Sequence, residues 1–194
     1  MNRYIVNRVL TTLQWARIMF YTALSSGRSR GRARKWQPVL ILGKGTVEFE
    51  RGVNLGFFPS PFFMSGYIHL EARNSNSIIR IGEDTHINNN FVAIAEHTSI
   101  TIGKKCFIGT NVEILDSDFH GLKVSERATS DPQKARPVVL GDDVFIGSNA
   151  RIMKGVVIGN GSVITNSAVV VREIPPGVVA GGNPAVVLRT IERE

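Results

Sequence analysis

The chain has 194 residues, of which 43% are hydrophobic and 20% are charged, a composition that excludes an intrinsically disordered protein and suits one core-forming domain. Its single cysteine excludes an internal disulfide, and no cysteine–histidine spacing is typical of a zinc site, so we expect no metal. The net charge of +7 is accompanied by no DNA- or RNA-binding motif, so nucleic acid is not an expected partner. The sparing use of cysteine fits a reducing, cytoplasmic compartment.

The positive charge is concentrated in an N-terminal extension, residues 1–36. Nine of the 23 basic residues and none of the 16 acidic residues precede Glu48, which leaves 14 basic against 16 acidic residues for the remainder. Apolar residues recur in the extension at roughly helical spacing, namely Ile5, Val9, Leu13, Phe20 and Leu24. Arg8 and Arg17 interrupt them, so no uninterrupted run of about 18 apolar residues exists to span a bilayer.

Two interpretations of this extension stay open. The helix could pack on its own protein or on a neighbouring subunit. It could instead lie in a membrane interface, with the stretch RSRGRARK attracted to anionic lipid at the inner face of the cell membrane.

Residues 37–194 form the second predicted unit, which is governed by a repeat of six residues. From residue 140 the chain reads LGDDVF, IGSNAR, IMKGVV, IGNGSV and ITNSAV, and the blocks IGEDTH, IGKKCF and IGTNVE keep the same phase earlier. Each block opens with an aliphatic residue and carries a small or β-branched one four places later, a position that Cys106 also occupies. Such a hexad predicts a short strand and a turn, with three hexads closing one coil of a parallel β-solenoid. We therefore expect an all-β domain behind a helical extension, with a short C-terminal tail.

The repeat is interrupted by a predicted loop, residues 116–138, which opens with DSDFH. The chain has four histidines, His69, His86, His97 and His120. Of these, only His120 follows a pair of hexads and stands at the mouth of the loop, where a neutral imidazole could accept a proton near pH 7. Asp118 would face the same way as His120 in an extended chain and could orient the ring. Asp116 and a backbone carbonyl are the alternatives for that role.

Three segments occur in a specific order, NVEILDSDFHG, then PVVLGDDVFIGSNARIMKGVVIGNGSVI, then IPPGVVAGGNPAVVLR. Through them, residues 78–189 resemble the hexapeptide-repeat acyltransferases, which fold as left-handed parallel β-helices. The similarity is greatest to the galactoside, maltose and xenobiotic O-acetyltransferases and to the sugar O-acetyltransferases of surface-polysaccharide gene sets. This resemblance implies an acetyl-CoA-dependent O-acetyltransferase, active as a homotrimer, with its sites in clefts between subunits.

The resemblance also implies roles for individual residues. The catalytic base would be His120, assisted by Asp118, without a covalent acyl-enzyme. The residues expected to bind the cofactor are Gly147, Ser148, Lys154, Asn166, Arg172 and Arg189. Within this set, backbone N–H groups near Gly147 and Ser148 would meet the oxyanion, and the arginines or Lys154 would meet the phosphates. Asn88 and Asn90 would bind the acceptor.

The resemblance says least about the acceptor, because the basic extension and the hydrophobic stretch GFFPSPFFMSGY replace the short helical N-terminal region of the family. A sugar or a lipid-linked glycan is the first expectation, in surface-polysaccharide biosynthesis. A xenobiotic hydroxyl, and a non-catalytic solenoid that serves as a scaffold, remain alternatives.

Overall fold

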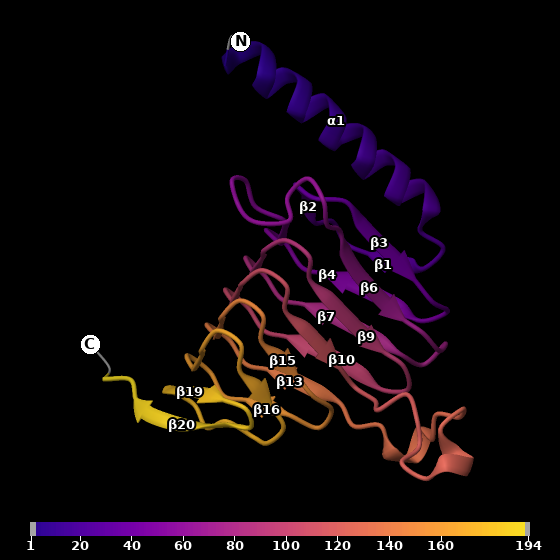
Figure 1. Ribbon diagram of the computed structural model, residues 1–194, viewed down its shortest axis with the longest axis vertical. Coiled ribbons are helices and arrows are strands. Elements are labelled where there is room, and N and C mark those ends of the chain that lie inside the picture. Colours follow the sequence, from indigo (N-terminus) through magenta and orange to yellow (C-terminus); the bar gives the residue numbers. More distant parts are fainter. Residues whose placement is uncertain (1–2, 193–194) are drawn as a thin grey trace.

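The computed structural model describes the backbone of residues 3–192 and the side chains of residues 8–192. Helix α1 (Arg3–Leu24) precedes a stack of short strands that wind through three sheets (Figure 1). The first sheet contains, in order, β1 (Arg28–Arg30), β4 (Thr46–Phe49), β7 (Ile78–Ile81), β10 (Ser99–Ile102), β13 (Val138–Leu140) and β16 (Val157–Ile158). The third sheet contains β3 (Val39–Leu42), β6 (Ile68–Ala72), β9 (Val92–Ala95), β12 (Glu113–Leu115), β15 (Arg151–Ile152) and β18 (Val169–Val170).

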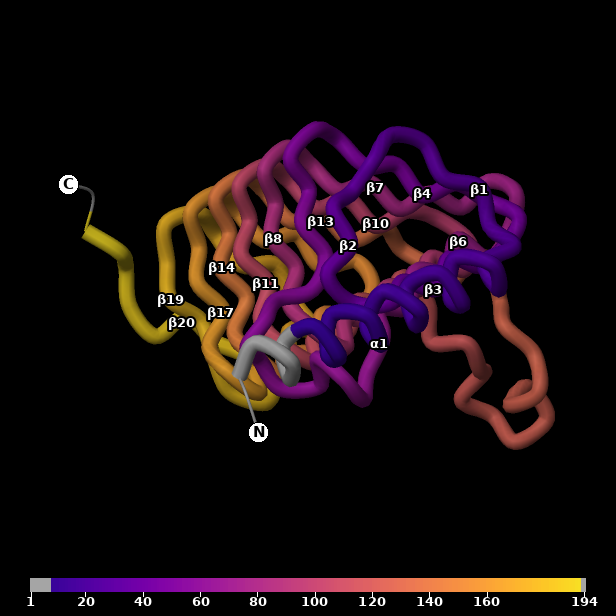
Figure 2. Tube along the Cα trace, turned by 90° about the horizontal axis from the view of Figure 1, so that it is seen from above, coloured from indigo at the N-terminus to yellow at the C-terminus, as the bar shows by residue number. Residues whose placement is uncertain are grey.

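The second sheet contains β2 (Arg34–Lys35), β5 (Asn54–Leu55), β8 (His86–Ile87), β11 (Phe107–Ile108), β14 (Phe145–Ile146), β17 (Val163–Ile164), β19 (Val178–Gly182) and β20 (Ala185–Thr190). All of its pairs are parallel except β19 with β20, which turn back on each other and end the solenoid. The chain visits the three sheets in turn, so each circuit is one coil of a parallel β-helix. The view from above shows these coils stacked on one another (Figure 2).

The hexad phase explains the core. Ile79, Ile100 and Val138 occupy equivalent places in successive coils, pair in register and are fully buried. The slot four places into the hexad is buried as well, including Cys106, whose thiol pKa is raised by that burial. The two hexad positions that recur in the sequence are therefore the buried positions of the core, and Cys106 is one of the residues that fill it.

The corners of the solenoid need a left-handed backbone, which each coil supplies at the same place. In the four coils from β8 onward, the residues with positive φ between the second and third sheets are Asn90, Asn111, Asn149 and Ser167. The asparagines also form a ladder, since Asn90 Nδ2 donates to Asn111 Oδ1 at 2.8 Å and Asn111 Nδ2 donates to Asn149 Oδ1 at 2.9 Å. Asparagine tolerates this conformation better than most residues, which accounts for its recurrence at the turns.

Helix α1 lies across the N-terminal end of the solenoid, alongside β3 (Figures 1 and 2). The side chain of Gln14, a residue of α1, is buried between the helix and the solenoid. Its Nε2 donates to the carbonyls of Trp36 (3.0 Å) and Phe63 (2.9 Å). Arg17 donates to Gln14 Oε1 and to the carbonyl of Gly66. The interpretation in which the helix packs on its own protein is therefore correct for this face, while the side chain of Ile5 lies outside the described residues.

The basic stretch after α1 belongs to the first coil. Strands β1 and β2 pair with β4 and β5, so RSRGRARK is the outer rim of the solenoid and not a free tail. The division into 1–36 and 37–194 stays a prediction. Within the described residues, no helix is both long enough and apolar enough to cross a membrane.

Candidate active site around His120

The loop that follows β12 projects from one edge of the solenoid (Figures 1 and 2). It contains two short 3₁₀ turns, Val124–Glu126 and Pro132–Lys134, and carries His120 near its start. The imidazole is exposed, and its Nδ1 lies 2.6 Å from the carbonyl oxygen of Arg127 in the same loop. A carbonyl oxygen can only accept, so Nδ1 carries the proton and a neutral ring has its free lone pair on Nε2. This geometry leaves Nε2 of an exposed ring as a proton acceptor at the edge of the solenoid.

The two acids beside His120 are engaged elsewhere. Asp116 is fully buried and accepts hydrogen bonds from the backbone N–H groups of Glu96, His97 and Thr98, at 2.7, 3.1 and 2.7 Å, so its carboxylate closes the preceding corner. The carboxylate of Asp118 is paired with the ammonium of Lys154. Of the three groups that the sequence offered to orient the ring, the structure brings the backbone carbonyl to His120.

A buried carboxylate that sequence reasoning missed holds the base of this loop. Glu96 accepts hydrogen bonds from Ser130 Oγ (2.6 Å), Ser117 Oγ (2.7 Å) and Arg73 Nη1 (2.8 Å), so it ties both ends of the loop to the solenoid wall. Arg73 also lies 5.0 Å from the ring centroid of Phe119, the residue before His120. The available signal in the sequence was an acid directly after the apolar run VAIA, where a buried charge requires partners.

The pKa of Glu96 reports the same arrangement. Burial raises the pKa of this carboxyl, but the hydrogen bonds from Ser130, Ser117 and Arg73 stabilise the charged form and together lower the pKa below its ordinary value. Glu96 is thus ionised at neutral pH and acts as a fixed acceptor for the loop.

The residues expected along the cofactor do not all lie together, and three of them form one group. Gly147, Ser148 and Asn166 stack at the corner between the second and third sheets, where a Cβ on Gly147 would lie 2.5 Å from the backbone nitrogen of Asn166. The N–H of Gly147 donates to the carbonyl of Ile164 at 2.8 Å, and that of Ser148 donates to Asn166 Oδ1 at 2.9 Å. Both N–H groups are therefore used within the solenoid, and an oxyanion would need other donors.

The three cations expected at the phosphates differ in their surroundings. Lys154 is occupied by Asp118 and by the carbonyl of Lys134 (2.9 Å). Arg172, just after β18, and Arg189, in β20, are exposed, and neither forms an ion pair with any side chain of residues 8–192. The two arginines are thus the members of this set that are available to an anionic ligand.

The asparagines expected to bind the acceptor lie at the same corner as Ser148. Asn90 belongs to the asparagine ladder and its N–H donates to Gln37 Oε1 at 2.8 Å, whereas Asn88 accepts from the N–H of its neighbour. The residue between them was missed. Asn89 is fully buried and its amide holds the segment 57–61, donating to the carbonyls of Phe57 and Pro61, each at 2.9 Å.

The structure therefore divides the predicted site between two corners of the solenoid. His120, Lys154 and Arg172 follow strands of the third sheet, whereas the group around Asn90 and Ser148 precedes those strands. The five residue steps from Asn111 to Asp116 span about 16 Å of extended chain, well beyond hydrogen-bond reach. One chain does not bring the two groups together.

Comparisons with known proteins agree with this architecture. The family model described as Bacterial transferase hexapeptide (six repeats) matches residues 137–172, and that described as Hexapeptide repeat of succinyl-transferase matches residues 99–122. The galactoside O-acetyltransferase of Escherichia coli K12 is 36% identical over 115 residues, which cover 59% of this chain and 55% of that protein. The chain spans little more than half the length of that protein and of the putative acetyltransferase YJL218W of Saccharomyces cerevisiae.

Two solved structures are similar over more of the chain. The polySia specific acetyltransferase NeuO aligns with a TM-score of 0.66 and 25% identity, covering 86% of this chain and 73% of that one. The hexapeptide-repeat acetyltransferase VCA0836 of Vibrio cholerae O1 biovar eltor, in complex with acetyl coenzyme A, aligns with a TM-score of 0.59 and 25% identity, covering 98% and 87%.

The chain thus has the left-handed parallel β-helix fold, built from hexapeptide repeats, and both the predicted fold class and the resemblance to acetyltransferases of that fold are confirmed. The relatives named above are acetyltransferases, and one of them was solved with acetyl coenzyme A bound. Among the side chains of residues 8–192, no group of three or more histidines, cysteines and acids is arranged to hold a metal ion.

Proposed function

We propose that this protein is an acetyl-CoA-dependent O-acetyltransferase with His120 as its general base. The observation that carries the proposal is the hydrogen bond between His120 Nδ1 and the carbonyl of Arg127, which leaves Nε2 as the acceptor on an exposed ring. Acetyl-CoA would supply the activated acyl group. His120 would take the proton from the acceptor hydroxyl as its oxygen bonds to the thioester carbonyl, and would then return that proton to the departing sulfur of CoA. No covalent acyl-enzyme is needed.

A homotrimer would complete the site. Because the His120 corner and the Asn90 corner lie on opposite edges of the third sheet, they can meet only if the edge of one subunit faces the other edge of its neighbour. In that arrangement Ser148 and Asn166 would flank the pantetheine arm, and the free Arg172 and Arg189 would meet the phosphates of CoA. Asn88 and Asn90 would contact the acceptor beside His120.

A sugar hydroxyl is the proposed acceptor, in the assembly of a surface polysaccharide. This choice is supported by the names of two relatives, one a galactoside O-acetyltransferase and the other a polySia specific acetyltransferase. Asp118 and Lys154 would stand next to His120 as a charged pair with hydrogen-bonding capacity for a polyhydroxy ligand.

We also propose that the N-terminal end of the solenoid contacts an anionic membrane. On the outer side of α1, the side chains of Val9, Leu13, Phe20 and Leu24 are each more than half exposed. The rim of exposed arginines that follows contains no acid, and among its arginines only Arg30 forms an ion pair with a described side chain, that of Glu48. A boundary between apolar and basic side chains suits the interface of an anionic bilayer. Each basic residue near such a surface contributes about 1 kcal/mol to the free energy of binding.

The general-base assignment is tested by His120→Ala with His86→Ala as the matched control. His86 is an exposed histidine on β8 whose ring stacks on Phe107, with centroids 5.2 Å apart, and it lies outside the proposed site. With acetyl-CoA and a panel of soluble sugars, His120→Ala should lose at least about 100-fold in kcat, as expected for removal of a positioned base, while His86→Ala keeps the parent rate. Turnover by His120→Ala within threefold of the parent would exclude the assignment.

A further inference from the structure

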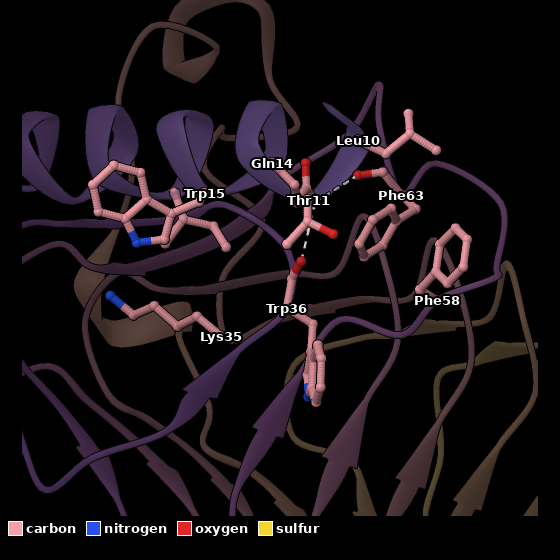
Figure 3. Close-up of a pocket in the computed structure, with 9 residues that line it drawn as sticks. Leu10, Thr11, Gln14, Trp15, Lys35, Trp36, Phe58 and Phe63 are labelled. Carbon is pink, nitrogen blue, oxygen red and sulfur yellow. Dashed lines mark hydrogen bonds between the residues drawn. The ribbon is translucent and has the colours of Figure 1, made fainter. Parts of the chain in front are cut away.

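The N-terminal end of the solenoid contains a cavity that the proposed transfer chemistry does not use. It has a volume of about 400 Å³ and lies between α1, Lys35 at the end of β2 with Trp36 directly after it, and the loop after β5. Its lining consists of Leu10, Thr11, Gln14, Trp15, Ile18, Lys35, Trp36, Phe58 and Phe63 (Figure 3). The volume is in the range of small-molecule sites, and four of the nine lining residues are aromatic.

The cavity is formed by fixed contacts. Gln14 spans it from above and hydrogen-bonds to Trp36 on one wall and Phe63 on the other (Figure 3). The rings of Phe58 and Phe63 lie 5.1 Å apart, and the guanidinium of Arg34 lies 4.0 Å from the ring centroid of Trp36. The walls are thus present before any ligand arrives, so binding would not have to order them.

The cavity has one cationic side. Lys35 and Trp15 lie on one side of it, and Leu10, Phe58 and Phe63 lie on the other (Figure 3). None of the lining residues is acidic, the first acid of the chain is Glu48, and no ion pair of the described side chains involves Lys35. Burial lowers the pKa of Lys35, as expected for a half-buried ammonium without a counter-charge.

The cavity is also connected to the corner expected to bind the acceptor. Gln37, next to Trp36, donates to the carbonyl of Phe62 and accepts from the N–H of Asn90. Asn89 holds the segment that carries Phe58. The cavity therefore continues the edge of the solenoid that carries Asn88 and Asn90.

We infer that this cavity binds a single apolar chain that ends in a phosphate, with the chain against Trp15, Trp36, Phe58 and Phe63 and the phosphate at Lys35. An aromatic-lined cavity suits hydrocarbon, and an unpaired ammonium at its margin suits a phosphate. The lipid carrier of a glycan precursor and a membrane phospholipid both join hydrocarbon to a phosphate, but the phospholipid has two chains and the carrier has one. We assign the ligand to the first, the lipid part of a lipid-linked acceptor, and that identity rests on the proposed function, whereas the binding itself does not.

The two tryptophans of the chain, Trp15 and Trp36, both line the cavity, so intrinsic fluorescence reports on it directly. The full chain is titrated with n-octyl phosphate below its micelle concentration, without acetyl-CoA, and we expect a saturable shift of the emission to shorter wavelength. n-Hexyl phosphate should bind on the order of tenfold more weakly, since each buried methylene contributes about fourfold. Trp15→Phe and Trp36→Phe, which each leave one reporter, should both still respond.

The headgroup is tested with Lys35→Gln and, as its matched control, Lys44→Gln, which removes an exposed lysine outside the cavity. Lys35→Gln should lower the affinity for n-octyl phosphate about fivefold and leave the affinity for the neutral n-octyl β-glucoside unchanged. Lys44→Gln should change neither affinity. Equal losses in the two variants, or equal affinity of the parent for both amphiphiles, would refute the role of Lys35.

The source of the ligand is tested by competition. Farnesyl phosphate, a single isoprenoid chain, should displace n-octyl phosphate at lower concentration than the two-chain phospholipid dihexanoyl phosphatidylglycerol; the reverse order would overturn the assignment to a lipid-linked acceptor. A response to anionic vesicles without any response to n-octyl phosphate would refute the cavity as a binding site. These titrations need no turnover, so failure of the His120 test leaves their outcome intact.

Discussion

The substitution Glu96→Gln tests whether the loop that carries His120 is held by one buried carboxylate. In the parent, three donors converge on Glu96 at 2.6–2.8 Å, from Ser130, Ser117 and Arg73. Hydrogen bonds to a charged group contribute about 1.5–3 kcal/mol each. Glutamine retains one acceptor oxygen, but its amide nitrogen replaces the second acceptor oxygen of the carboxylate. Of the two carboxylates that pair with Arg73, the variant keeps only Glu71. We therefore expect the free energy of unfolding to fall by about 2 kcal/mol at pH 7.

The dependence on pH follows from the lowered pKa of Glu96. A carboxyl whose pKa is lower in the folded than in the unfolded state stabilises the fold above its unfolded pKa, and this stabilisation is lost as the pH falls through the folded pKa. The difference in the free energy of unfolding between the parent and Glu96→Gln should thus have its full value at pH 7 and become smaller below about pH 4.3. If this difference in stability grew as the pH fell, the hydrogen bonds to the ionised carboxylate would not be the cause of the lowered pKa of Glu96.

The measurement is urea denaturation of parent and variant at one protein concentration, because association contributes to apparent stability. Glu113→Gln is the matched control, since Glu113 pairs with the exposed Arg151 and such a pair contributes at most about 1 kcal/mol. Turnover of Glu96→Gln should fall about tenfold through misplacement of His120 while the KM for acetyl-CoA is retained. A variant as stable as the parent at pH 7, with unchanged hydrogen exchange in residues 117–136, would refute the anchoring role.

Three further predictions concern other parts of the molecule. Asn89→Ala should leave several carbonyls of segment 57–61 without their donor and lower stability by about 2–3 kcal/mol, with proteolysis in that segment as the readout; resistance equal to the parent would contradict it. In analytical ultracentrifugation the active species should sediment at about three times 21.3 kDa, and an active monomer would exclude a site shared between subunits. Liposome flotation should recover the full chain on anionic but not on neutral vesicles, less so at high salt; a version without residues 1–24 that floats equally well would remove α1 from the contact.

The sequence alone determined the solenoid because its cause is local and periodic. An aliphatic residue every six positions has to be covered by the next coil, and stacking in register is the arrangement that buries the residues around Ile79, Ile100 and Val138 together. The same period determined the corners, which need a left-handed residue such as Asn111. An interruption of the period marked the loop, and with it His120.

Only the tertiary structure decided which groups support the site. Glu96 and Ser130 are 34 residues apart, and Asn89 and Phe57 are 32 apart, separations that bear no relation to the hexad and depend on how loops fold back on the solenoid. The partner of His120 was open in the sequence for the same reason, because three candidates lay within reach and the fold of the loop selects the carbonyl of Arg127. The extension was ambiguous because an amphipathic pattern does not identify what covers it; the buried amide of Gln14 decided which face of α1 meets the solenoid.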